Sequence, residues 1–343
     1  SGVHALVVLV DEWLHEENLS EDEKIKEGQL IINKLCVYVS SPFALASEYD
    51  ELTQDSPAAE GLYKNREQEF YIHKAELQAE ADVRLNIMKE IHARLQGPDK
   101  NTPGAWSNFE YDFSGSIFFY PVDFTHSYYA KPVNFSGSAY WGEADFSYST
   151  YMDEVYFSES SYQGRAGFNG SIYQGEADFR GSTYRRWAYF NDSICCGWAG
   201  LSHSVYAGEA DFSGSIFCSE IYFGYSTHSD SFSCFIGCTP QFYDETNRKN
   251  TLFGSPDNNF TVENGRGHPI YNGLEDLPLG CCFLAETQEE YLSGIFKEIE
   301  ETREKLLTTE YFQEKIGLPG KLRAFNTALH EWREKVTTAQ RTR

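Results

Sequence analysis

Apolar and polar positions repeat every eleven residues through the middle of the chain, where Gly, Ser, Tyr and Phe, all poor helix formers, are frequent. A first column holds Phe at ten of eleven successive positions and Leu at the other: Phe113, Phe124, Phe135, Phe146, Phe157, Phe168, Phe179, Phe190, Leu201, Phe212 and Phe223. A second column lies five residues further on: Phe118, Tyr129, Tyr140, Tyr151, Tyr162, Tyr173, Tyr184, Cys195, Tyr206, Phe217 and His228. Ser stands two residues before every member of the second column, from Ser116 to Ser226.

A small or β-branched residue, such as Ala144 or Val155, stands two residues before most members of the first column. Residues two apart in extended backbone point to the same face, so each small residue and its ring point inward together. Glycines such as Gly115 and Gly137 allow the chain to turn after each short face. The period therefore predicts a β-solenoid whose interior is filled by rings.

Units such as Ala177–Gly181 (ADFRG) and Ala210–Gly214 (ADFSG) resemble the A-(D/N)-(L/F)-x-x unit of pentapeptide-repeat proteins. The resemblance covers about residues 110–240, in a form where units of five and six residues alternate and Phe replaces the usual central Leu. It implies a right-handed quadrilateral β-helix of about six coils with 22 residues each. At ~4.8 Å per rung the rod would be roughly 29 Å long.

The N-terminal region, residues 1–105, has two helical patterns, over 20–40 and 66–96. Ser20 and Glu23 have the spacing of a capping box at the start of the first. The second has an apolar stripe at steps of three and four residues: Phe70, Leu77, Ala81, Leu85, Met88, Ile91 and Leu95. Residues 41–65 between them are expected to form a loop.

After the solenoid (106–240), residues 241–285 show no period, and 286–343 predict a helical hairpin broken at Pro319–Gly320. The last helix carries an apolar stripe: Leu322, Phe325, Leu329, Trp332 and Val336. We expect one helix at each end to cap the open solenoid, because a bare terminal rung exposes rings and unpaired backbone. The alternative is that a stripe such as this one docks another protein.

The net charge of −24 divides as −10 over residues 1–100, −10 over 101–240 and −4 over 241–343. Direct binding of nucleic acid needs clustered Lys and Arg, so we do not expect it. The acidic surface favours solubility and basic partners.

The sequence GEADF at 142–146, 175–179 and 208–212 contains the most regular acidic residues. With 22 residues per coil, copies 33 apart lie on opposite sides of the rod and cannot form one active site. We therefore expect solvated outer-face acids, with Asp hydrogen-bonded to corner backbone, that could also form part of an interaction surface: Glu143, Asp145, Glu176, Asp178, Glu209 and Asp211.

The eight cysteines show no paired C-x-x-C units, so neither a zinc site nor a disulfide scaffold is expected. Cys195 and Cys234 fall on inward columns, and Cys196 and Cys218 share an outward column one coil apart. These thiols indicate an intracellular, reducing compartment. No cofactor is expected, since no histidine pair or Gly-rich phosphate loop appears. The apolar run 5–10 is shorter than the ~20 residues of a membrane span, so membrane association is expected only through a segment before residue 1.

These observations favour a non-enzymatic scaffold in which an acidic β-helix and helical flanks bind other proteins, as a subunit of a larger assembly. Two alternatives stay open. Some pentapeptide-repeat proteins are similar to B-form DNA in size and charge and act on type II topoisomerases, and the charge of the rod is compatible with that role. The chain could also be the cytoplasmic part of a membrane-anchored protein.

Overall fold

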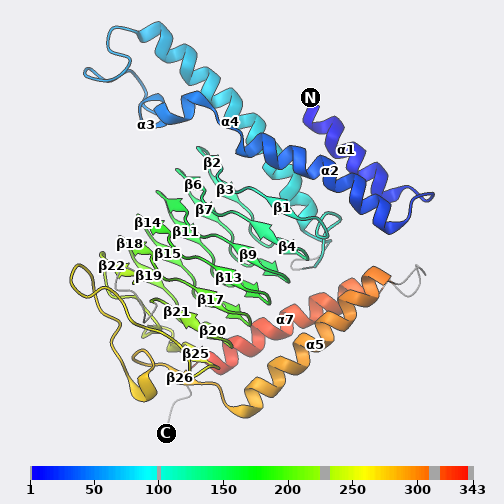
Figure 1. Cartoon of the computed structure of the whole chain (residues 1–343), viewed down its shortest axis with the longest axis vertical. Helices are drawn as coiled ribbons and strands as arrows, with labels where there is room; N and C mark the ends of the chain where they lie inside the picture. The colour runs from blue at the N-terminus through cyan, green and yellow to red at the C-terminus, as the bar shows by residue number, and fades with distance from the viewer. Residues whose placement is uncertain (1, 99–101, 225–231, 309–316, 339–343) are drawn as a thin grey trace.

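Strands of two residues follow one another at intervals of five or six residues and build four parallel sheets (Figure 1). The computed structural model describes residues 2–98, 102–224, 232–308 and 317–338. Tyr111 pairs with Val133 and Ala177 with Ala199, so one coil takes 22 residues, as predicted. The regular part makes about five turns, from β1 to β21, and His228 and Ser226 lie outside the described residues.

We number the sheets in the order in which the chain first enters them. Sheet I consists of β1 (Tyr111–Asp112), β5 (Val133–Asn134), β9 (Val155–Tyr156), β13 (Ala177–Asp178), β17 (Ala199–Gly200) and β21 (Ile221–Tyr222). Sheet II consists of β2 (Ile117–Phe118), β6 (Ala139–Tyr140), β10 (Ser161–Tyr162), β14 (Thr183–Tyr184), β18 (Val205–Tyr206) and β22 (Cys234–Phe235).

Sheet III consists of β3 (Val122–Asp123), β7 (Ala144–Asp145), β11 (Ala166–Gly167), β15 (Ala188–Tyr189) and β19 (Ala210–Asp211). Sheet IV consists of β4 (Tyr128–Tyr129), β8 (Thr150–Tyr151), β12 (Ile172–Tyr173), β16 (Ile194–Cys195), β20 (Ile216–Phe217), β25 (Leu252–Phe253) and β26 (Cys282–Phe283).

Both ring columns fill the interior of the solenoid. Every Phe of the first column, Leu201, and the seven Tyr of the second column are at most 5 % exposed. Successive rings of one column stack: the centroids of Tyr151 and Tyr173 lie 5.0 Å apart with planes 2° apart. Rings of adjacent faces meet edge to face, as Phe157 and Phe168 do at 5.0 Å. Both geometries are those that aromatic pairs prefer.

The Ser column satisfies backbone groups at the inner corners. The hydroxyl of Ser171 accepts the N–H of Ser149 at 3.1 Å and donates to the carbonyl of Phe146 at 3.3 Å. The same pair of bonds repeats from coil to coil, for example at Ser182. Ser is small enough for the narrow interior and offers both a donor and an acceptor, which explains its place in every unit.

A left-handed residue recurs every eleven positions, one before each Ser. Gly occupies five of these ten positions, and the others have φ between 56° and 62°: His126, Tyr148, Glu159, Asp192 and His203. This conformation is costly for residues with a Cβ, which is why Gly is frequent there.

Helices close the N-terminal end of the solenoid, as predicted. These are α1 (Gly2–His15), α2 (Glu21–Ser40) and α4 (Glu67–Leu95), with η1 (Ala44–Glu48) and α3 (Tyr49–Leu52) in the predicted loop. Ser20 and Glu23 form the predicted capping box. Trp106 and Phe109, both fully buried, continue the ring-filled core into these helices.

The run 5–10 lies in α1, where Val7 and Val10 are buried. The stretch Glu21–Leu52 is apolar and long enough to cross a membrane by length and composition alone. Within the cap, however, Ile31, Ile32 and Leu35 of this stretch are buried in the protein core.

The opposite end is covered by the segment 232–284 and not by the C-terminal helices. Phe242 stacks on Phe212 at 5.2 Å, and Phe260 on Phe223 at 6.2 Å. This segment also contains β23 (Tyr243–Asp244), β24 (Lys249–Asn250) and η3 (Leu274–Asp276), and its β25 and β26 extend sheet IV. The expectation of C-terminal helical capping is therefore wrong.

The placement of Cys234 on an inward column is also wrong. Tyr206 pairs with Phe235, 29 residues further on, and their rings stack at 4.5 Å, while Cys234 pairs with outward Val205. The period of eleven ends at Phe223, because additional residues enter before Ser233 resumes the Ser column.

The C-terminal helices α5 (Glu286–Thr308) and α7 (Leu318–Thr337) form a hairpin along the side of the solenoid (Figure 1). Pro319 and Gly320 lie in the first turn of α7, where the missing N–H of Pro costs little.

Candidate interaction surfaces

The three GEADF copies lie on alternating sides of the solenoid. Ala144 and Ala210 belong to sheet III, and Ala177 belongs to sheet I. Glu143, Glu176 and Glu209 are exposed. The copies therefore do not converge on a common site, as the period of 22 residues requires.

The Asp of each copy supports the corner that follows it. One carboxylate oxygen accepts the backbone N–H two residues on, a local bond that Asp makes readily at turns. These oxygens of Asp145, Asp178 and Asp211 lie 3.0, 3.0 and 2.9 Å from the nitrogens of Ser147, Arg180 and Ser213. The Asp residues thus have an architectural role.

The expectation that all these acids are solvated is wrong for Asp178, which is 6 % exposed. The guanidinium of Arg180 is 2.7 Å from its carboxylate and 4.9 Å from the ring centre of Trp198. Asp145 and Asp211 are half-buried, and burial raises the pKa of Asp211. Arg180, two residues further along the chain, thus gives the buried Asp178 side chain an oppositely charged partner.

The stripe of the last helix, predicted as an interaction surface, covers the outer face of sheet IV in the same chain. Leu322 and Leu329 are 3 % and 0 % exposed, and Phe325 and Trp332 pack around them. The face that they cover is an outward column with one residue per coil: Tyr128, Thr150, Ile172, Ile194, Ile216 and Leu252. These mostly apolar side chains would otherwise face water, which explains why the hairpin binds here. The stripe is thus not free to dock a partner.

Polar contacts fix the hairpin on this face. Arg333 of α7 forms an ion pair with Asp192 at a corner of the solenoid. Lys249 lies 2.9 Å from both Asp192 and Glu334, and so joins the segment 232–284 to the same cluster.

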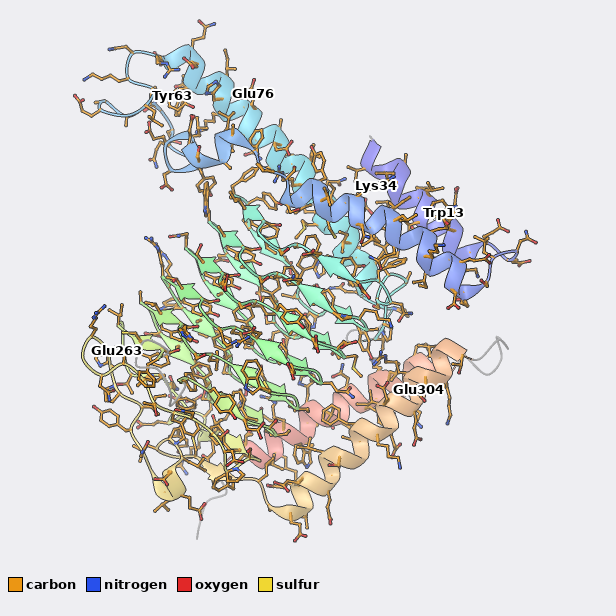
Figure 2. All side chains as sticks on the ribbon, viewed as in Figure 1. Trp13, Lys34, Tyr63, Glu76, Glu263 and Glu304 are labelled. Atoms are coloured by element: carbon orange, nitrogen blue, oxygen red, sulfur yellow. The ribbon has the colours of Figure 1, made fainter. Side chains whose placement is uncertain are left out.

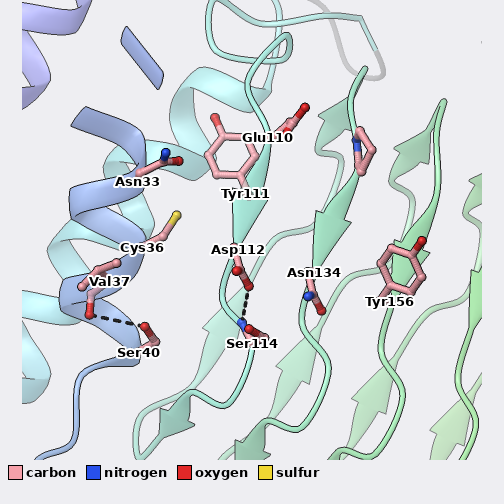
Figure 3. Close-up of a pocket in the computed structure, with 11 residues that line it drawn as sticks. Asn33, Cys36, Val37, Ser40, Glu110, Tyr111, Asp112, Ser114, Asn134 and Tyr156 are labelled. Atoms are coloured by element: carbon pink, nitrogen blue, oxygen red, sulfur yellow. Dashed lines mark hydrogen bonds between the residues drawn. The ribbon is translucent and has the colours of Figure 1, made fainter. Parts of the chain in front are cut away.

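A groove of about 500 Å³ runs between α2 and the outer face of sheet I (Figure 3). We call it the α2 groove. Asn33, Cys36 and Val37 line it from the helix, and three successive coils line it with Asp112, Asn134 and Tyr156.

The α2 groove lacks a reactive group among its lining residues. Burial raises the pKa of the Cys36 thiol to about 12, so it stays protonated at neutral pH. Asp112 accepts the backbone N–H of Ser114 at 3.0 Å. A hydrogen bond from Tyr156 to Glu154, together with burial, raises the pKa of Tyr156 to about 12. The geometry suits binding better than catalysis.

A helical arm projects beyond the solenoid at the N-terminal end (Figures 1 and 2). We define the arm as residues 44–83, which include η1, α3 and the first half of α4. Its buried residues continue the main hydrophobic core, and among them Tyr63 and Phe70 meet edge to face at 5.5 Å. The arm is therefore an ordered projection.

One face of α4 in the arm is apolar and exposed. Ile72 is 49 % and Val83 is 38 % exposed, and Ala75 and Ala79 between them are exposed as well. These four residues follow steps of three and four, so they form one stripe along the helix. Tyr71, next to it, is 47 % exposed. Sequence analysis missed this exposed stripe, because the stronger apolar pattern in the same segment is that of the buried stripe on the other side of the helix.

The C-terminal end of the solenoid has a second groove, of about 680 Å³, which we call the end groove. Residues 239–246 form one wall, and Ile270, Tyr271 and 278–280 form the other. Tyr271 and Leu279 are 60 % and 66 % exposed. No period marks this segment, so its exposed residues could not be identified from the sequence.

All eight cysteines are free thiols. The sulfur atoms of Cys196 and Cys218 lie 3.9 Å apart in successive coils, as the shared column predicts. Among the described residues no three His, Cys, Asp or Glu side chains are placed to hold a metal ion.

Comparison of the chain with family models, with curated proteins and with solved structures gave no match. The resemblance to pentapeptide-repeat proteins therefore stays a prediction from the residues.

Proposed function

We propose that the protein is a non-enzymatic scaffold whose solenoid is a rigid spacer and whose arm binds another protein. The observation that carries this proposal is the exposed apolar stripe of α4, from Ile72 to Val83, on an ordered projection with buried side chains beneath it. Apolar anchors at three- and four-residue steps are typical of helix-mediated recognition.

Rigidity supports the same role. The interior of the solenoid is a continuous stack of rings, and a ring-filled core leaves few ways to bend. Its two ends and its sides therefore hold fixed positions relative to one another, which is what a spacer between binding surfaces needs.

Co-purification tests the proposal. The tagged full chain is expressed in the organism that encodes it, as wild type and as the double variant Ile72→Ser, Val83→Ser. The control is Leu30→Ser, which changes a 52 % exposed residue of α2 outside the arm.

We expect a stoichiometric partner with the wild type and the control, and its loss with the double variant. A strictly monomeric protein in native mass measurements, with no stoichiometric partner, would remove the proposal.

Mimicry of DNA toward a type II topoisomerase is a second candidate, supported by the exposed Glu143, Glu176 and Glu209. Two features count against mimicry of DNA. The hairpin covers one of the four faces of the solenoid, and the Asp residues are bound to corner backbone. A supercoiling assay with type II topoisomerase tests it, and inhibition at micromolar protein would favour it.

A further inference from the structure

A β-hairpin, residues 271–279, borders the end groove and turns apolar side chains outward. The N–H of Gly273 bonds to the carbonyl of Leu277 at 2.7 Å, and that of Leu279 to the carbonyl of Tyr271 at 2.8 Å. Leu277 is 2 % exposed and joins the main core. The hairpin is thus anchored, and its conformation is defined.

Three apolar residues of this hairpin are nevertheless exposed: Tyr271 at 60 %, Leu274 at 83 % and Leu279 at 66 %. Single exposed apolar residues are ordinary on protein surfaces, but three on one short hairpin beside a groove are a typical feature of an interaction site. Leu274 lies at the tip, and the other two line the groove.

The backbone at the tip is strained. Glu275 and Asp276 both have left-handed φ, 58° and 59°, although neither is Gly. Two consecutive residues of this kind cost stability and persist only where the surroundings impose them. Here the buried Leu277 and the hairpin bonds impose the conformation that keeps Leu274 in solvent.

The floor of the groove approaches the hairpin closely because of Gly280. Its φ is 81°, and a Cβ there would lie 3.0 Å from Cβ and Cγ of Tyr243. Tyr243 and the hairpin therefore form adjacent walls, and Tyr243, Ile270 and Leu279 supply apolar side chains to a lining that also contains polar ones.

Acids outnumber bases around the groove. Asp244 and Glu245 line it, and none of its lining residues is a base. Glu275 and Asp276 lie at the tip of the hairpin that borders it. Over residues 239–284 as a whole, six acids stand against three bases. Glu245, Glu275 and Asp276 have no ion pair with any described residue. Lys249, one of the three bases, is already bound to Asp192 and Glu334. The negative potential at this end is thus not neutralised within the described chain.

We propose that the end groove binds a segment of another protein that places an apolar side chain against Tyr271 and Leu279 and Lys or Arg on either side. This rests on the proposed scaffold function and adds a second binding surface, at the end of the solenoid opposite the arm. The apolar side chains of the groove select the central residue, and the surrounding acids select the flanking charges.

Selection of short random peptides displayed on phage, with the full chain as bait, tests the proposal. Selected peptides are then labelled with fluorescein and titrated against the wild type, Leu279→Ser, Leu274→Ser and Glu245→Lys. Matched controls are Leu30→Ser and Glu331→Lys, which change an exposed Leu of α2 and an exposed Glu of α7. Circular dichroism melting shows whether each variant folds, and Leu274 is too exposed for its replacement to disturb the core.

We expect the selected peptides to share an apolar residue flanked by Lys or Arg, and the groove variants to weaken binding about tenfold or more. The controls should bind as the wild type does. The proposal would be overturned if no peptide is selected or if the selected peptides lack basic flanks. It would also be overturned if the groove variants bind the peptides as tightly as the wild type does. Ile72→Ser of the arm is titrated with the same peptides. If it abolishes peptide binding and Leu279→Ser does not, the groove proposal fails while the scaffold function stands.

Discussion

The side-chain amide of Asn326 in α7 donates a hydrogen bond to the hydroxyl of Thr150 in β8, 3.0 Å away, and both residues are buried. Thr150 is the polar member of an otherwise mostly apolar outward column on sheet IV, and Asn326 is the polar residue that faces it. A buried polar group needs a partner, so this bond fixes the position of the hairpin along the solenoid. The hairpin is therefore an integral part of the folded protein.

Truncation of Leu329, a fully buried residue of α7, should loosen the packing of the hairpin on sheet IV. Leu329→Ala should lower the free energy of unfolding by about 2–5 kcal/mol, because Leu329 is fully buried against sheet IV. Glu331→Ala, an exposed change in the same helix, should stay within about 0.5 kcal/mol of the wild type. Urea unfolding followed by circular dichroism measures both. Equal, small effects would mean that the hairpin does not pack as described.

The same interface should be sensitive to acid through His330. Burial, with a contribution from Arg333, lowers the pKa of His330 to about 4 from 6.5. The nearby Asp192 opposes this shift, and His126 adds to it. The folded state binds the proton less readily than the unfolded state, so stability is complete above pH 6.5 and is lost as the pH falls toward 4.

Over that range the loss from His330 should reach roughly 3 kcal/mol. His330→Gln should flatten the pH dependence of the unfolding free energy between pH 6.5 and 4. His15→Gln, at the end of α1, is the matched control and should leave the curve unchanged in shape. Parallel curves for His330→Gln and the wild type would show that His330 does not titrate as a buried group.

The solenoid could be predicted from the sequence because its rule is local and repeated: a ring, a Ser and a small residue return at fixed steps. The exact placement of Phe168 or Tyr151 needs only the period. The hairpin on sheet IV could not be placed in this way, although Ile172, Ile194 and Ile216 carry a signal at 22-residue steps. That signal appears only when the outward columns of the four faces are read separately.

Two other features depend on contacts that no short pattern contains. The change of register at Phe235 follows from the stacking of its ring on Tyr206, which replaces the position expected for His228. The exposure of Tyr271 and Leu279 follows from how an irregular segment folds over the last rung. Local sequence patterns predict neither the change of register nor these exposed residues, because both depend on packing between residues far apart in the chain.

A small cavity inside the solenoid lies where Cys195 and Leu201 interrupt two of the ring columns. Leu201→Phe should complete the column between Phe179 and Phe223 and stabilise the protein by about 0.5–2 kcal/mol. Phe179→Leu, the reverse change one coil earlier, should destabilise it by about 1–3 kcal/mol. Thermal unfolding measures both variants. A lower melting temperature for Leu201→Phe would show that the site has no room for a ring.

The central claim is that the side chains of the Phe column point into the interior of the solenoid, whereas acids such as Glu176 on the outer surface point into water. Phe168 is fully buried and contacts the rings of Phe146, Phe157, Phe179 and Phe190, whereas Glu176, eight residues on, is exposed. The most direct test is urea unfolding of Phe168→Ala and Glu176→Gln side by side. We predict a loss of about 3–5 kcal/mol for Phe168→Ala and almost none for Glu176→Gln. Equal effects of the two substitutions would contradict the inward and outward assignment on which the whole account rests.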